Sequence, residues 1–174
     1  MRLEEKHCST EFELEGYKLF NVDRQGRRSG RVALYVKEGI NCFIYKSIKT
    51  NDNVESILVE LFSGKEKLVM GVAYRPPNAT DDLTTALLHE IDRASSHSNL
   101  YIVGDFNCSN IDWDVLIGDP QEERLIEIIQ DNILVQLINE LTRINNILDL
   151  ILCKNDIVAT EIKEGGKLRV SDYD

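Results

Sequence analysis

The chain has 174 residues, of which 43% are hydrophobic, and its formal net charge at pH 7 is −10. This size and composition predict one globular domain with a sizeable core and exclude a short disordered tail. The acidic balance argues against a protein that coats nucleic acid by bulk attraction, because phosphate binding depends on Lys and Arg that release counterions. Any contact with nucleic acid is therefore expected to be local.

The sequence contains neither a membrane-spanning segment nor a secretory signal. Its apolar runs are far shorter than the roughly 20 residues that a transmembrane helix needs. The first ten residues, MRLEEKHCST, are charged and lack an apolar core. The four cysteines are too far apart for a zinc or redox motif, so free, buried thiols are expected. We therefore expect an intracellular protein, in the nucleus or the cytoplasm, without membrane contact.

Strand-like segments dominate the first half of the chain. Residues 30–45 contain two β-branched and aromatic runs around a Lys-Glu-Gly turn, which predicts a hairpin. Residues 55–61 and 67–74 predict a second hairpin. Pro76 and Pro77 should end its second strand, because a proline nitrogen cannot donate to a β-ladder.

Two helices are predicted further along the chain. Residues 81–94 place apolar side chains on one helical face, with Asp81 or Asp82 positioned to cap the start. A second helix should begin at Asp119, because Pro120 then occupies the first turn and a glutamate follows three positions after the cap. The apolar stripes are Leu83, Leu87, Ile91 and Ala94 in the first helix, and Leu125, Ile128 and Ile129 in the second.

The remaining segments complete a mixed α/β pattern. Residues 100–103, 146–153 and 156–163 have the composition of strands. The chain shows no internal repeat, low-complexity tract or linker. The economical interpretation is a single α/β domain over residues 1–174, in which residues 1–10 are poorly defined.

Several common catalytic motifs are absent from the sequence. There is no GxxxxGK[ST] loop, no GxGxxG after a strand and no HExxH. His7, His89 and His97 have no serine or cysteine neighbour in a nucleophile-elbow context, and the helical phase of His89 points away from the apolar face. A covalent serine or cysteine mechanism therefore has little support.

Polar side chains instead follow the apolar strands. In α/β sheets ligands bind at strand ends, because loops there present side chains that the sheet holds rigid. The candidates are Tyr74 and Arg75, Asp105 and Asn107, and Ser171 and Asp172. A further carboxylate, Asp149, lies within an apolar strand, where burying even a neutral polar group unpaired costs about 2 to 7 kcal/mol. Asp149 should therefore have a partner.

Two simpler interpretations of these residues stay open at this point. Asp149 could be a solvent-facing strand residue or could cap a neighbouring loop. Gly-Asp-x-Asn at residues 104–107 is also good turn chemistry.

The order of several motifs resembles the endonuclease/exonuclease/phosphatase superfamily, and most closely the endonuclease domain of non-LTR retrotransposon reverse transcriptases. An upstream GYKLFNVDR…GRVALYVKEG pattern extends the similarity, which runs from about Glu11 to the C-terminus. The motifs are VAYRPPN (72–78), IVGDFN (102–107), IDW (111–113), ILDLIL (147–152) and the terminal SDYD.

This resemblance implies two packed mixed β-sheets flanked by helices, a four-layer α/β sandwich, here expected to be incomplete at its N- and C-terminal strands. It also implies cleavage of DNA phosphodiester bonds with Mg²⁺ or Mn²⁺, which would polarise the phosphoryl oxygens and stabilise the leaving oxyanion. The oligomeric state does not follow from the sequence.

The resemblance assigns roles at the first two strand ends. Asp105 would be the general base for the attacking water and would also contact the metal. Asn107 would hold the phosphate or that water through its amide, and Asp105 and Asn107 should project to one side because they lie two apart on a strand end. Tyr74 would donate a hydrogen bond to the scissile phosphate, and Arg75 would add positive charge for substrate binding.

The last motif departs from the family pattern. Asp172 would bind the metal. Asp149 would steady the residue that follows Asp172, which is Tyr173 where the family has histidine. A phenol, with an ordinary pKa of about 10, donates a hydrogen bond but offers no positive charge. The metal-binding Glu expected near the start is not recognisable either. A catalytically silent remnant that acts as an interaction module therefore stays open, as does a phosphatase for small substrates.

Overall fold

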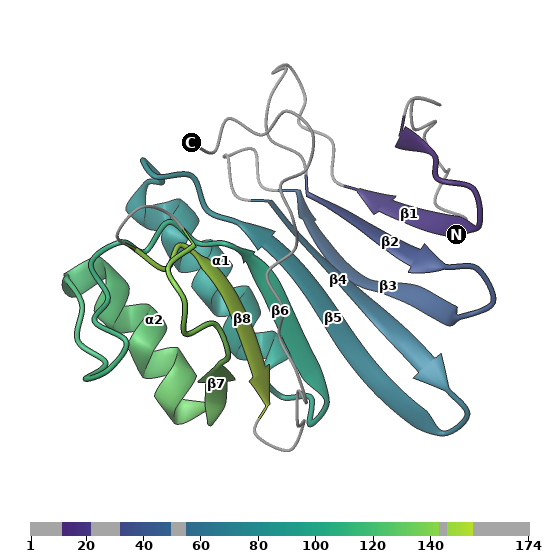
Figure 1. Ribbon diagram of the computed structural model, residues 1–174. Coiled ribbons are helices and arrows are strands. Elements are labelled where there is room, and N and C mark those ends of the chain that lie inside the picture. The colour runs from purple at the N-terminus through teal and green to yellow at the C-terminus, as the bar shows by residue number, and fades with distance from the viewer. Residues whose placement is uncertain (1–11, 22–31, 50–54, 143–145, 155–174) are drawn as a thin grey trace.

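The computed structural model describes residues 12–21, 32–49, 55–142 and 146–154 (Figure 1). In chain order, the elements are β1 (Tyr17–Asn21), β2 (Ala33–Lys37), β3 (Asn41–Lys49), β4 (Glu55–Ser63), β5 (Glu66–Tyr74), α1 (Asp81–Ala94), β6 (Leu100–Asp105), α2 (Pro120–Asp131), β7 (Leu134–Gln136) and β8 (Asp149–Lys154).

The strands form two sheets. β1 and β2 make a two-stranded antiparallel sheet, and the other strands make a six-stranded sheet in the order β3-β4-β5-β6-β8-β7. The larger sheet is mixed, because β5 and β6 are parallel while β4 and β8 run antiparallel to their neighbours. Figure 1 shows α1 and α2 together beside β6 and β8. The two sheets and two helices of the described residues confirm the predicted mixed α/β sandwich.

Apolar side chains pack on both faces of the larger sheet. On the helix face, Val69, Leu100 and Leu152 are fully buried against residues of α1 and α2. On the opposite face, Ile57 and Val59 of β4 pack against residues of the smaller sheet. The sheet is therefore the central layer, and its two faces have different surroundings.

One of the two predicted hairpins is correct. β4 and β5 pair over their full lengths, from Glu55 opposite Tyr74 to Ser63 opposite Glu66. The hairpin predicted within residues 30–45 is wrong, because β2 pairs with β1 whereas β3 pairs with β4. A turn still joins β2 to β3, but it carries the chain from one sheet to the other. As expected, β5 ends before the two prolines.

Both predicted helices are present. α1 covers the expected residues, but its N-cap is Thr80, and Asp81 and Asp82 lie in the first turn. There their carboxylates still face the positive end of the helix dipole. α2 is capped as expected by Asp119, whose side chain accepts hydrogen bonds from the next two backbone amides inside the helix. Neither helix combines the length and apolarity that crossing a bilayer requires, within the residues described.

The remaining predicted segments had mixed outcomes. β6 extends the expected strand to Asp105, and β8 begins only at Asp149, later than the predicted start. The three-residue strand β7 was not predicted. The segment 156–163 lies outside the described residues. Cys42, Cys108 and Cys153 are free and buried, as expected for these three thiols.

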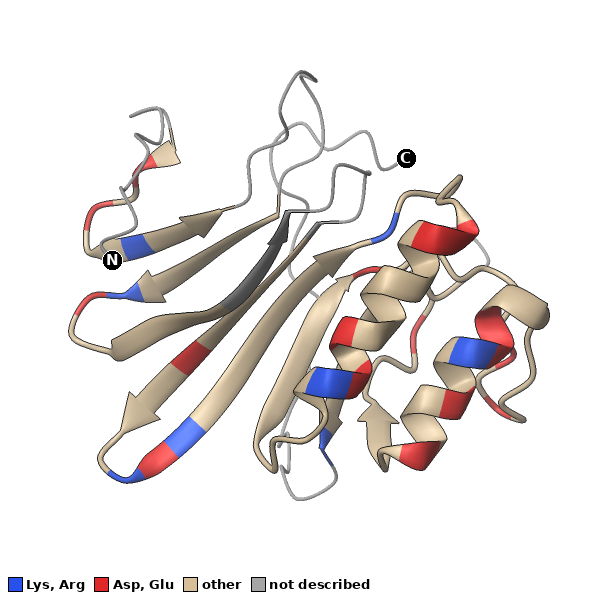
Figure 2. Cartoon of the chain, turned by 180° about the vertical axis from the view of Figure 1, so that it is seen from behind, with Lys and Arg blue, Asp and Glu red and all other residues tan. Residues whose placement is uncertain are grey.

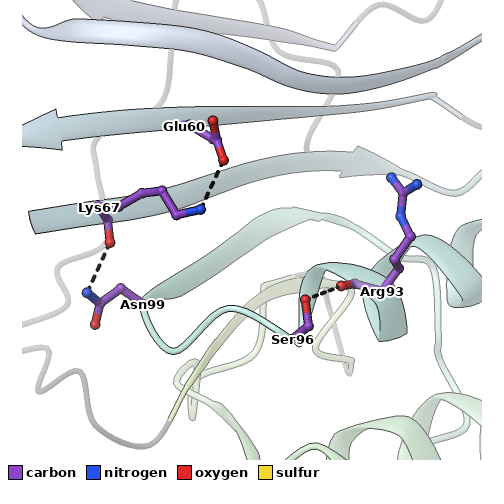
Figure 3. A network of polar contacts seen from close by, with 5 residues as sticks. All are labelled: Glu60, Lys67, Arg93, Ser96 and Asn99. Atoms are coloured by element: carbon purple, nitrogen blue, oxygen red, sulfur yellow. Dashed lines mark hydrogen bonds and ion pairs between the residues drawn. The ribbon is translucent and has the colours of Figure 1, made fainter.

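Polar contacts fix the start of β6 against β5, at the end of the sheet far from Tyr74 (Figure 3). The Asn99 side-chain amide donates to the Lys67 carbonyl at 3.0 Å, and the Lys67 ammonium lies 3.1 Å from a Glu60 carboxylate oxygen. The Val69 amide also donates to the Asn99 carbonyl at 2.9 Å. These contacts set the register that carries β6 forward beside β5.

Candidate active site

Three of the predicted site residues lie in register on adjacent strands. Tyr74, the last residue of β5, is paired with Asp105, the last residue of β6. Asp105 is in turn paired with Asp149, the first residue of β8. Because neighbouring strands are about 4.8 Å apart, this row spans roughly 10 Å. The fold thus brings together residues that are up to 75 positions apart in the chain.

The row faces away from the helices. Side chains alternate along a strand, and Ala73 and Leu150 pack in the helix-side core. Their neighbours Tyr74 and Asp149 therefore point to the opposite face, and Asp105 shares that face through its register with both. Tyr74 indeed packs against the cluster on that side. All three residues of the row are half-buried, so polar atoms at this face remain within reach of solvent.

Gly104 allows β5 and β6 to approach at the row. A Cβ atom added to Gly104 would lie 1.8 Å from the Ala73 carbonyl oxygen, which no side chain can tolerate. Gly104 also lies within β6 rather than in a turn. The glycine of the Gly-Asp-x-Asn motif is thus required by strand packing beside the candidate base.

Asn107 reaches the site from a loop rather than from the strand. β6 ends at Asp105, so the alternation expected to align the two side chains does not apply. Asn107 instead has a left-handed backbone, with φ of 49°. Its amide N–H donates to Asp105 Oδ1 at 3.1 Å, and its side-chain Nδ2 donates to the Arg75 carbonyl at 2.8 Å. The conformation of the loop, and not the alternation of side chains along a strand, therefore places Asp105 and Asn107 side by side.

Arg75 lies on the other side of this loop. Its side chain is buried and donates to Thr84 of α1 and to the carbonyls of Phe106 and Asn107, each at 3.2 Å. The structure therefore does not bring the guanidinium into the row. Thr84 was missed in the sequence analysis, although a hydroxyl on the apolar face of a predicted helix is a detectable signal.

A buried carboxyl lies near the start of α2. Glu122 is 5% exposed, its Oε1 accepts a hydrogen bond from the Asn110 amide at 3.2 Å, and its Oε2 is buried without a hydrogen-bond partner among the described residues. Burial raises the pKa of the Glu122 carboxyl, against the opposing influence of the Asn110 hydrogen bond. Burial likewise raises the pKa of the Cys108 thiol to about 12, although the charge of Arg75 opposes this.

The donor chemistry of the row fits a hard cation only in part. Carboxylate and amide oxygens are suitable ligands for Mg²⁺, and Asp105, Asn107 and Asp149 supply them. Within the described part of the chain, however, no three His, Cys, Asp or Glu residues gather into a metal-binding group. Asp172, the other predicted ligand, and Tyr173 lie outside that part.

Three solved structures share the fold of this chain. The endonuclease domain of TRAS1, a telomere-specific non-LTR retrotransposon, matches with a TM-score of 0.65 and 16% identity, over 82% of this chain and 69% of that one. The human Nocturnin catalytic domain matches with a TM-score of 0.54 and 15% identity, over 80% and 61%. A mannosyl-6-phosphatase from Bacteroides thetaiotaomicron matches with a TM-score of 0.55 and 10% identity, over 82% and 64%.

The chain belongs to the endonuclease-reverse transcriptase family, whose model matches residues 68–172. This match includes Tyr74, Asp105, Asn107 and Asp149. The chain spans less than two thirds of the Nocturnin and mannosyl-6-phosphatase structures. The comparison with curated proteins gave no match.

Proposed function

We propose that this domain is a metal-dependent phosphodiesterase that cuts DNA, of the type found in non-LTR retroelements, with Mg²⁺ or Mn²⁺ as cofactor. The observation that carries the proposal is the in-register row of Tyr74, Asp105 and Asp149. Beside that row, the backbone amide of Asn107 donates a hydrogen bond to the Asp105 carboxylate. Membership of the endonuclease-reverse transcriptase family supports the assignment.

Each residue of the row has a distinct task in this proposal. Asp105 accepts a proton from the attacking water, which forms the new bond to phosphorus as the bond to the leaving oxygen breaks. Tyr74 donates its phenolic hydrogen bond to the scissile phosphate, and Asn107 positions the phosphate or the water without adding negative charge. Asp149 steadies Tyr173, which follows Asp172 in the chain.

The cation would be held by Asp105 and Asp172. When bound, it supplies electrostatic stabilisation of the phosphate and of the oxyanion that leaves. The carboxylate of Asp105 suits this chemistry because Mg²⁺ prefers hard oxygen ligands.

The distribution of charge indicates the direction from which DNA approaches. α1 and α2 each expose three acidic residues, and each carries one arginine. Figure 2 shows these acidic positions along both helices. Because DNA is a polyanion, the helix side of the domain repels it. The row of Tyr74, Asp105 and Asp149 opens to the opposite face, where the helices do not interfere.

Nicking of a supercoiled plasmid in Mg²⁺ tests this function. Wild-type protein should nick the plasmid and lose this activity on chelation, whereas Asp105→Asn and Asn107→Ala should lower the rate by about 10²- to 10³-fold. Asp114→Asn is the matched control, because Asp114 is an exposed carboxylate in the loop that follows. Equal background nicking by wild type and Asp105→Asn would refute the proposal.

A binding module without cleavage is the second candidate, favoured by Tyr173 at the position of the family histidine. The variant Tyr173→His separates the two functions. Under the endonuclease proposal it increases the nicking rate. If the domain only binds, DNA is retained in a gel-shift assay while neither wild type nor Tyr173→His produces nicks.

A further inference from the structure

Arg75 connects the ends of three elements. It directly follows β5, it is 7% exposed, and its Nε donates to the hydroxyl of Thr84 in the first turn of α1 at 3.2 Å. One terminal nitrogen donates to the carbonyls of Phe106 and Asn107, in the loop after β6. All three acceptors belong to the protein, and Thr84 lies on α1, on the helix side of the sheet.

Main-chain contacts close a ring around the same loop. The Arg75 amide donates to the Asp105 carbonyl at 2.9 Å. The Asn107 side chain donates in return to the Arg75 carbonyl, and the Asn107 amide donates to the Asp105 carboxylate. Asn107 has a left-handed backbone, a conformation that asparagine adopts more readily than most residues and that the hydrogen bonds of this ring stabilise. The guanidinium fixes the two carbonyls that define this conformation.

Arginine is suited to this task in a way that lysine is not. The planar guanidinium presents several donors in a rigid fork, so one side chain can hold a hydroxyl and two carbonyls at once. An ammonium is a compact point charge on a flexible stem and cannot keep the same spread of contacts. The charge of Arg75 also interacts with the carboxyls of Asp119 and Glu122, so the buried cation is not electrostatically isolated.

We propose that Arg75, supported by Thr84, is a positioning residue that aligns Asp105 and Asn107 for phosphodiester cleavage. This inference rests on the proposed function and differs from the substrate-binding role that the family resemblance implied for Arg75. A positioning residue acts on the rate of the chemical step, since small misplacements of reacting groups are costly. A phosphate ligand acts on DNA binding and its dependence on salt.

Steady-state nicking by Arg75→Lys, measured over a range of salt concentrations, distinguishes these roles. We expect kcat to fall by about 10- to 100-fold, with KM and its salt dependence unchanged. Arg124→Lys is the matched control, because Arg124 of α2 donates to the neighbouring Thr85 hydroxyl at 2.9 Å without touching the loop. An increased KM identifies a phosphate contact and overturns the proposal, as does an unchanged kcat.

Two variants of Thr84 test the same contact without removing the buried cation. Thr84→Val deletes the acceptor of the Arg75 Nε–H and should lower kcat, whereas Thr84→Ser keeps a hydroxyl and should restore it. If Arg75→Lys does not fold, this pair decides the question. Equal kcat values for Thr84→Val and Thr84→Ser would contradict the positioning role.

Hydrogen exchange separates this inference from the proposed function. If the wild type does not nick DNA, the function fails, but the Asn107 amide still reports whether Arg75 holds the loop. Its exchange should be at least about 10-fold faster in Arg75→Lys and Thr84→Val than in the wild type, because the loop opens locally. Arg124→Lys and Thr84→Ser should match the wild type. Identical exchange in all five proteins overturns the positioning claim.

Discussion

Tyr74 and Asp105 are paired residues at the ends of the parallel strands β5 and β6, 31 positions apart in the chain. Parallel strands end at the same edge of a sheet, so the loops that follow them leave from neighbouring points. The Arg75 amide therefore reaches the Asp105 carbonyl at 2.9 Å. The pairing of the two strands thus places the Tyr74 phenol beside the Asp105 carboxylate at the same edge of the sheet.

Removing the Tyr74 hydroxyl should affect activity more than stability. In Tyr74→Phe the ring still packs against the apolar cluster between the sheets, but the proposed hydrogen bond to phosphate is lost. We expect the plasmid nicking rate to fall by about 10- to 100-fold, with the denaturation midpoint nearly unchanged. Tyr101→Phe is the control, because Tyr101 lies earlier on β6 and on the same face as Asp105. Equal nicking rates for the two variants would remove Tyr74 from the mechanism.

Gly104→Ala should destabilise the domain, because the new methyl group would meet the Ala73 carbonyl oxygen. We expect a loss of about 3 kcal/mol in the free energy of unfolding, at the upper end of the usual range for overpacking. Urea denaturation followed by circular dichroism measures it. In the control Gly64→Ala, the methyl group meets nothing within 4 Å and only the positive φ of 61° opposes it, which costs about 1 kcal/mol. A smaller loss for Gly104→Ala than for Gly64→Ala would contradict the close approach.

Local patterns predicted the helices and the β4–β5 hairpin, because their signals lie within a few neighbouring residues. Asp119, for example, caps α2 through hydrogen bonds from the backbone amides of Gln121 and Glu122. The hairpin at residues 30–45 failed because pairing of β2 with β1 is a contact between distant segments. Periodicity reports which face is apolar, but it does not report which strand lies alongside.

The candidate site was predictable in its residue types but not in its geometry. Tyr74, Asp105 and Asp149 each end or begin an apolar strand, and the register that unites them is a property of the whole sheet. Arg75 was expected to face the substrate because it follows Tyr74 at the end of a strand. Arg75 instead lies one residue beyond β5, and its guanidinium is held by Thr84 of α1, which accepts its hydrogen bond.

Two buried thiols should be unreactive in the native protein. Burial raises the pKa of the Cys108 thiol to about 12 and also raises that of Cys153. The reactive thiolate is therefore scarce at pH 8. In a Cys8→Ser background, a maleimide should label Cys108 and Cys153 only after denaturation, as mapped by peptide mass spectrometry. Rapid native labelling at either position would show that its surroundings open.

Replacing the buried carboxylate of Glu122 should stabilise the domain at neutral pH. Because burial raises the folded-state pKa, ionisation of Glu122 opposes folding once the pH exceeds the unfolded value of about 4.3. Glu122→Gln keeps an acceptor for the Asn110 amide and removes this cost. Its unfolding free energy should exceed that of the wild type at pH 7, and the difference should disappear below about pH 4. The exposed neighbour variant Glu123→Gln should show no such gain, and a destabilised Glu122→Gln at pH 7 would mean that the charge is satisfied by Arg75.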